Sequence, residues 1–137
     1  MSPNEPKPAT PEAQALLRAA GGDSKTVELL LQHRDAPVSS VCFHAQQYLE
    51  KVMKAVLVSN AVIFRRTHDL EELADLLERQ GIELPLPKDQ LRRLSPFAVT
   101  IRYEDMEITL TDINTVAEMM ENAHAWVERQ IHEQLHD

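Results

Sequence analysis

The segment from Pro37 to Asn60 constrains the fold more than any other part of the chain. Its apolar residues follow helical spacing and, at 100° per residue, cover an arc of about 200°, which is wider than the stripe of a helix on a protein surface. The arc consists of Val41, Cys42, Ala45, Tyr48, Leu49, Val52, Met53, Val56 and Leu57. We therefore expect a helix that runs through the middle of a bundle and is covered on most sides.

Helical spacing also precedes this segment. Thr10 followed by Pro11 is typical of a helix start, because a hydroxyl can cap the first turn and the missing N–H of proline has no partner there to lose. The apolar pattern then continues to about Arg34, although Gly21 and Gly22 interrupt it. One kinked helix and two short helices both fit this pattern.

Further helices are predicted in the second half of the chain. The first opens at Thr67 and stops with a Schellman-type turn at Gly81–Ile82. It is followed by two helical turns over Lys88–Leu94, a short helix over Ser95–Ile101 and a last helix that is capped by Asp112. We expect Glu104–Leu110 to be a loop, since a lone strand would lack a partner. The predicted fold class is all-α, an up-and-down bundle of four to five helices.

The chain length predicts a single domain. With 137 residues, of which 43% are hydrophobic, the chain can bury a core of ordinary size without a metal or disulfide. Residues 1–9 carry three of the eight prolines and few apolar side chains. We expect them to form a disordered tail in front of one domain over residues 10–137.

Composition narrows the classes of function. The single cysteine excludes an internal disulfide and favours a reducing cytoplasm. No apolar run reaches the length of a membrane span, and no glycine-rich phosphate loop is present, so we expect neither a membrane anchor nor a cofactor. A metal site is not expected either, because the spaced ligands His124, Glu128, His132 and His136 all belong to one helix.

The charge is distributed unevenly along the chain. The net charge is −8, which argues against nonspecific binding of phosphates by the whole molecule. Residues 1–66 nevertheless have a balance of +2, whereas residues 67–137 have a balance of −10. A local basic surface is therefore expected on the first half.

One polar strip on the central helix is the main candidate site. Its members recur at spacings of three and four residues and are His44, Gln47, Lys51 and Lys54. Two ammonium groups, an imidazole and an amide could bind a phosphate and a base edge. The same strip could equally be a solvated helix face, with Glu50 and Lys54 forming an ordinary pair. Phe43 and Val58 lie on this side and suggest that a partner subunit covers it.

A second group of candidates surrounds the following connection. Arg65, Arg66 and His68 precede a helix start, where backbone N–H groups favour an anion. His68 could instead be a structural residue that ties the connection to the bundle. Arg102 and Tyr103 stand at a predicted helix end and give a weaker signal.

Three ordered blocks resemble the HEPN domain family, whose name stands for higher eukaryotes and prokaryotes nucleotide binding. The blocks are Cys42–Gln47 followed by Glu50-Lys51 and Lys54-Ala55, then Arg66–Leu70, then Pro96–Val99 with Arg102-Tyr103. The resemblance covers about residues 12–132. It implies a homodimeric bundle of about five helices, often paired with a minimal nucleotidyltransferase in modules that resemble toxin–antitoxin pairs.

Related branches of this family are metal-independent ribonucleases, which use an arginine and a histidine separated by four to six residues. The chain matches this pattern only at Arg129 and His136, close to its end, and we interpret that match as chance. His44, Lys51 and His68 match positions characteristic of the family.

The leading hypothesis is a nonenzymatic, dimeric helical module that binds a nucleotide, an RNA or a nucleotide-bearing partner protein. The resemblance and the charges give its nucleotide-binding set as His44, Gln47, Lys51, Lys54, Arg65, Arg66, His68, Arg102 and Tyr103. The alternatives are a ribonuclease that uses Arg129 and His136, and a purely structural dimerisation scaffold.

Overall fold

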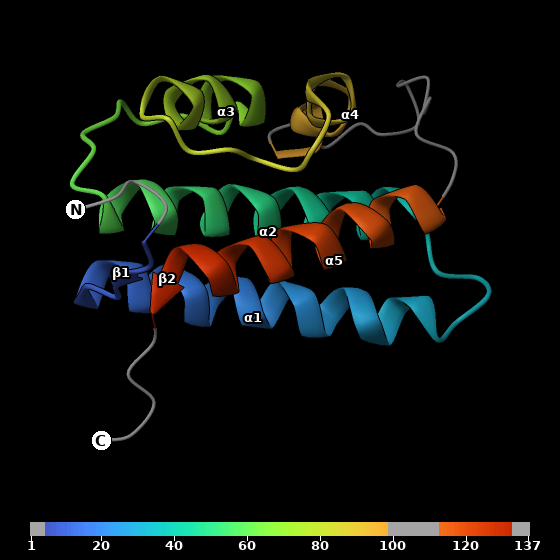
Figure 1. Cartoon of the computed structure of the whole chain (residues 1–137). Helices are drawn as coiled ribbons and strands as arrows, with labels where there is room; N and C mark the ends of the chain where they lie inside the picture. Colours follow the sequence, from blue (N-terminus) through green and yellow to red (C-terminus); the bar gives the residue numbers. More distant parts are fainter. Residues whose placement is uncertain (1–4, 99–112, 133–137) are drawn as a thin grey trace.

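The helices form two layers in the computed structural model, which describes residues 5–98 and 113–132. Three long helices lie side by side, and two short helices lie across one face of this layer (Figure 1). The elements are α1 (Pro11–Leu31), α2 (Val38–Ser59), α3 (Leu70–Arg79), α4 (Lys88–Leu94), the 3-10 turn η1 (Ser95–Ala98) and α5 (Ile113–Gln130). The all-α bundle predicted from the sequence is therefore confirmed.

Helix α2 lies at the centre of this arrangement. It contacts α1, α3, α4, η1 and α5. It runs antiparallel to α1 and in the same direction as α5 (Figure 1). Every residue of its predicted apolar arc is buried. The unusual width of that arc is thus explained by neighbours on several sides.

Helix α1 is continuous through its two glycines, so the single-helix alternative is the right one. The hydroxyl of Thr10 accepts a hydrogen bond from the backbone N–H of Ala13 at 3.1 Å, as the capping pattern predicts. A Cβ atom added at Gly21 or Gly22 would meet nothing within 4 Å. Packing inside the chain therefore does not require a glycine at either position.

Two helices end in the same hydrogen-bonded turn. After α3, Gly81 has φ +76° and the N–H of Ile82 bonds to the carbonyl of Leu77 at 3.0 Å, which confirms the predicted Schellman stop. After α2, the N–H of Val62 bonds to the carbonyl of Leu57 at 3.0 Å. Here the left-handed position is Ala61, with φ +58°. The second turn thus places an alanine in a conformation that favours glycine.

The two ends of the described chain meet in a short parallel pairing. β1 (Lys7–Pro8) pairs with β2 (Ile131–His132) beside the end of α5. The sequence analysis placed Lys7 and Pro8 in the tail and predicted no strand, so it did not foresee this pairing. Backbone hydrogen bonds to a partner far along the sequence hold these residues, and Ala9 packs against the core. The backbone pairing does not depend on apolar side chains, so the composition of the tail gave no sign of it.

Other expectations fall partly or wholly outside the described residues. The loop over Glu104–Leu110, the cap at Asp112 and the end of the helix expected over Ser95–Ile101 lie there, while η1 confirms a helical turn as far as Ala98. Among the helices of residues 5–98 and 113–132, none has both the length and the apolar character needed to span a membrane.

Candidate functional site

The predicted strip on α2 is bound at one side by a carboxylate from α1. Asp23 accepts a hydrogen bond from the ammonium group of Lys51, and its other oxygen lies 3.0 Å from Nδ1 of His44. The Asp23 side chain is only 10% exposed, so this charge is largely removed from water. Asp23 therefore links α1 to α2 and neutralises the cation that the sequence proposes for phosphate binding.

A second buried carboxylate, that of Glu50, pairs with Lys54 of the strip and with His68 of the following connection. Oε2 of Glu50 accepts a hydrogen bond from Lys54 at 2.8 Å and lies 2.9 Å from Nδ1 of His68. The Glu50 side chain is 8% exposed. The predicted pair of Glu50 and Lys54 is confirmed, but it is a buried pair that also ties the α2–α3 connection to α2.

Gln46 completes this second network. It is fully buried, and its amide nitrogen donates both to Glu50 at 3.1 Å and to the backbone carbonyl of His68 at 3.0 Å. Its amide oxygen accepts a hydrogen bond from Gln47 at 2.8 Å. The polar atoms of this buried side chain are thus all paired, as is usual for an amide in a protein core.

The balance of effects on Glu50 favours its charged form. Burial raises the pKa of the Glu50 carboxyl, but hydrogen bonds from Lys54, Gln46 and His68 lower it by more, so the pKa lies below its ordinary value. At neutral pH, the two carboxylates balance the charges of Lys51 and Lys54. The strip is therefore close to neutral and lacks the net positive charge that binding of a phosphate by its two lysines would require.

The backbone N–H groups at the start of α3 also have hydrogen-bond partners within the chain. Asp69 caps the helix by accepting hydrogen bonds from the backbone N–H groups of Glu71 and Glu72, and the hydroxyl of Ser95 accepts from the N–H of Leu70. The hydroxyl of Thr67 accepts from the N–H of Asp69. These N–H groups have partners already, which corrects the expectation that they favour an external anion.

The structure does not bring the candidates around this start into one cluster. Arg65 makes two hydrogen bonds to Glu72, at 2.8 and 2.6 Å. Arg66 is exposed and has no ion pair among residues 5–98 and 113–132. His68 is half exposed and turns its ring towards Glu50. Arg102 and Tyr103 lie outside the described residues.

The two apolar residues predicted on this side of α2 differ in their surroundings. Val58 packs against the hydrophobic core, although part of it stays accessible. Phe43 is half buried and stacks edge-on against His44, with ring centroids 5.0 Å apart. Phe43 therefore presents an aromatic ring beside a nearly neutral polar strip, a combination that is enriched at protein interfaces.

Three residues organise these networks. Sequence reasoning missed Asp23 and Gln46, and it identified Glu50 only as the partner of Lys54. Gln46 had a signal, because it falls among the apolar positions of α2 and yet is polar. Asp23 gave none, because its partners Lys51 and His44 lie on another helix, more than 20 positions along the chain.

Neither a metal site nor an activated thiol emerges from the part of the chain that is described. Burial raises the pKa of the Cys42 thiol to about 11, so it stays protonated at neutral pH. Groups of three or more potential ligands are absent from residues 5–98 and 113–132. Arg129 is exposed on α5, and its proposed catalytic partner His136 lies outside the described residues.

Comparison with known proteins gives one result that covers most of the chain. The family model described as HEPN domain matches residues 13–130. Searches of the curated proteins and of the solved structures found no match. The matched region extends from the first turn of α1 to the end of α5 and contains both polar networks.

Proposed function

Because the chain belongs to the HEPN domain family, we propose that it is a nonenzymatic interaction module that forms a homodimer and binds a nucleotide-bearing partner protein. The partner we propose is a minimal nucleotidyltransferase, so that the two proteins form a pair of the toxin–antitoxin type. Membership of the family supports this partner, and the geometry of α2 supports the way in which the two proteins would interact.

The observation that carries this proposal is the internal pairing of the strip. Lys51 and Lys54 each have a largely buried carboxylate as a partner, which leaves little net charge for a free phosphate to bind. A neutral strip loses less hydration free energy on burial against another protein than an uncompensated pair of lysines would. The pairing therefore supports an interface more than a nucleotide pocket.

Phe43 is the residue we propose as the anchor of the dimer interface. It is the large apolar side chain of α2 that is half buried and lies outside the hydrophobic core. Buried aromatic side chains at the centre of an interface often dominate the binding free energy. Gln47 and Lys54, both half buried on the same strip, would form polar contacts around it.

Contact with the nucleotide of the partner is proposed at the other end of the strip. Arg66 is exposed and free of ion pairs within the described chain, and His68 beside it is half exposed. An arginine in this state can form two parallel hydrogen bonds to a phosphate without first breaking an internal pair.

Sedimentation velocity of the full chain over a range of concentrations tests the dimer. We expect the wild type to sediment as a dimer and Phe43→Asp as a monomer. Ile63→Asp is the matched control, because Ile63 is 95% exposed and lies in the connection after α2. A wild type that stays monomeric, or a Phe43→Asp variant that dimerises as well as the control, would refute the proposed interface.

A further inference from the structure

A groove separates α1 from α5, with α2 at its floor. Its volume is about 420 Å³, within the range of small-molecule sites. The lining residues are Leu17, Ala20, Gly21 and Ser24 of α1, Tyr48 and Val52 of α2, His124, Val127 and Glu128 of α5, and Ile131. The groove shares no residue with the two polar networks, so its role is separate from the interface proposed above.

Tyr48 is a polar side chain of the groove that lacks a partner. It is 5% exposed, and its hydroxyl makes no hydrogen bond to any described residue. Burial and the negative charge of Glu128 raise the pKa of Tyr48 to about 12, so the hydroxyl keeps its proton. The hydroxyl oxygen is not fully enclosed, so it is available to bond to water or to a ligand atom in the groove.

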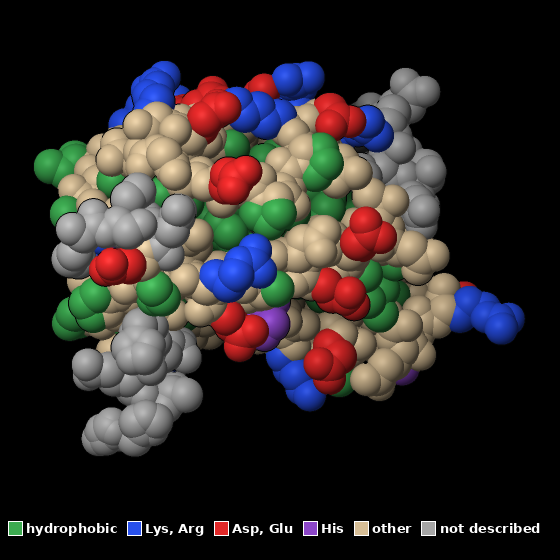
Figure 2. All heavy atoms as spheres, in the orientation of Figure 1, with side chains coloured by type: hydrophobic (Ala, Val, Ile, Leu, Met, Phe, Trp, Pro, Cys, Tyr) green, Lys and Arg blue, Asp and Glu red, His purple; other side chains and the backbone are tan. Residues whose placement is uncertain are grey.

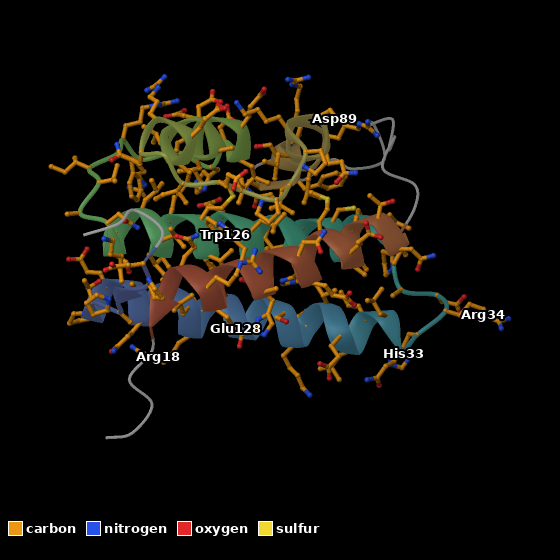
Figure 3. All side chains as sticks on the ribbon, viewed as in Figure 1. Arg18, His33, Arg34, Asp89, Trp126 and Glu128 are labelled. Carbon is orange, nitrogen blue, oxygen red and sulfur yellow. The ribbon has the colours of Figure 1, made fainter. Side chains whose placement is uncertain are left out.

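The described lining residues of the groove include one carboxylate, that of Glu128. Glu128 supplies a carboxylate that faces α1 (Figure 3), and His124 lies 3.6 Å from it. No lysine or arginine is among the groove's described lining residues. Acidic and basic side chains both lie on the face of the molecule around it (Figure 2). The Glu128 carboxylate, whose side chain is 69% exposed, therefore favours a cation over a phosphate or a carboxylate beside it.

The rest of the groove suits hydrocarbon. Leu17, Val52, Val127 and Ile131 contribute apolar side chains to its lining. Gly21 is also part of the lining, and a Cβ atom added there would meet no atom within 4 Å. A glycine inside a helix destabilises the helix relative to alanine. The open space at Gly21 is therefore accompanied by a lower stability of α1.

From these features we infer that the groove binds a small organic amine. The ammonium group donates hydrogen bonds to the Glu128 carboxylate and to the oxygen of Tyr48, and the hydrocarbon part lies on the apolar floor. The unpartnered hydroxyl, the single charge and the apolar walls each account for one part of such a ligand.

Titration of the full-length, ¹⁵N-labelled protein with n-hexylammonium, followed by NMR, tests this inference. We expect saturable shift changes at Tyr48, Val127 and Glu128. Hexanoate should cause none there, and 1-hexanol should bind several-fold more weakly. Equal binding of the alcohol and the amine, or no saturable change with the amine, would overturn the inference.

The two neighbouring glycines provide a matched pair of variants. Gly21→Leu places a side chain in the groove, and Gly22→Leu places the same side chain on the next residue, which does not line it. Both sites have room for a Cβ atom, and both changes raise helix propensity. We expect Gly21→Leu to abolish binding of hexylammonium and Gly22→Leu to retain it, and the opposite ranking would refute the site.

Two further variants test the polar contacts without filling the groove. Glu128→Gln changes an exposed side chain and should weaken hexylammonium binding by about threefold to fivefold, as expected for a pair near the surface. Tyr48→Phe should weaken it further while leaving hexanol binding unchanged. Unchanged binding of the amine by both variants would contradict the proposed contacts.

Discussion

The amide nitrogen of Gln46 donates a hydrogen bond to the backbone carbonyl of His68 across 3.0 Å, although 22 positions separate the two residues. This contact fixes the chain that leaves α2 against the helix it has just left. Since Glu50 holds the ring of the same histidine, both the backbone and the side chain of His68 are fastened to α2.

Replacement of Gln46 should destabilise the protein strongly. Gln46→Leu leaves the His68 carbonyl without this donor and removes a hydrogen bond from the charged Glu50, so we expect a loss of about 2–4 kcal/mol. Urea unfolding followed by circular dichroism measures it. Gln47→Leu, at a half-buried neighbour that donates one hydrogen bond, should lose less than half as much. Equal losses would mean that Gln46 does not organise the network.

The Glu50 carboxylate predicts a specific dependence of stability on pH. Its pKa in the folded protein lies below its ordinary value of 4.5, so its contribution is present above that value and is lost as the pH falls through the folded pKa. The difference in unfolding free energy between the wild type and Glu50→Gln should therefore be largest near neutral pH and shrink below pH 4.5.

Unfolding curves at several pH values measure this difference. Glu118→Gln on α5 is the control, because Glu118 is exposed and pairs with no described residue. A difference for Glu50→Gln that stays constant down to the acid range would show that its charge is not what stabilises the fold.

The two Schellman turns predict opposite effects of exchanging glycine and alanine. Ala61 has φ +58°, which is unfavourable for a residue with a Cβ atom, so Ala61→Gly should stabilise the protein by about 0.5–1 kcal/mol. Gly81→Ala should destabilise it by about 1 kcal/mol, since Gly81 has φ +76°. Thermal or urea unfolding reports both changes, and a destabilising Ala61→Gly would contradict the strain assigned to Ala61.

Local patterns in the sequence were sufficient to predict most of the fold. The width of the apolar arc identified α2 as the central helix, and the Thr10 cap and the Gly81 stop depend on neighbouring residues alone. The pairing of Lys7 and Pro8 with the end of α5 could not be predicted in this way, because it joins the two ends of the described chain through backbone groups.

The candidate site was harder to predict because its partners come from different elements. Spacing on one helix placed His44 and Lys51 together correctly. It could not show that Asp23 lies against both, since 28 positions separate Asp23 from Lys51. A spaced set of cations therefore indicates which groups share a face but not whether that face carries net charge.

Neutralisation by Asp23 predicts that its removal creates an anion site. Asp23→Asn frees Lys51 and His44, which are 26% and 30% exposed and stay close together. The variant should bind ATP more tightly than the wild type, with an affinity that falls as salt is added. Glu28→Gln removes one negative charge from an exposed position on the same helix and controls for net charge.

The most direct test of whether Asp23 neutralises the cations of α2 is a calorimetric titration with ATP. It compares the wild type with Asp23→Asn, Glu28→Gln and Lys51→Ala. We expect the wild type and Glu28→Gln to show no saturable binding at the strip, and Asp23→Asn to gain it. Saturable ATP binding by the wild type that disappears in Lys51→Ala, with the unfolding free energy unchanged, would contradict this account.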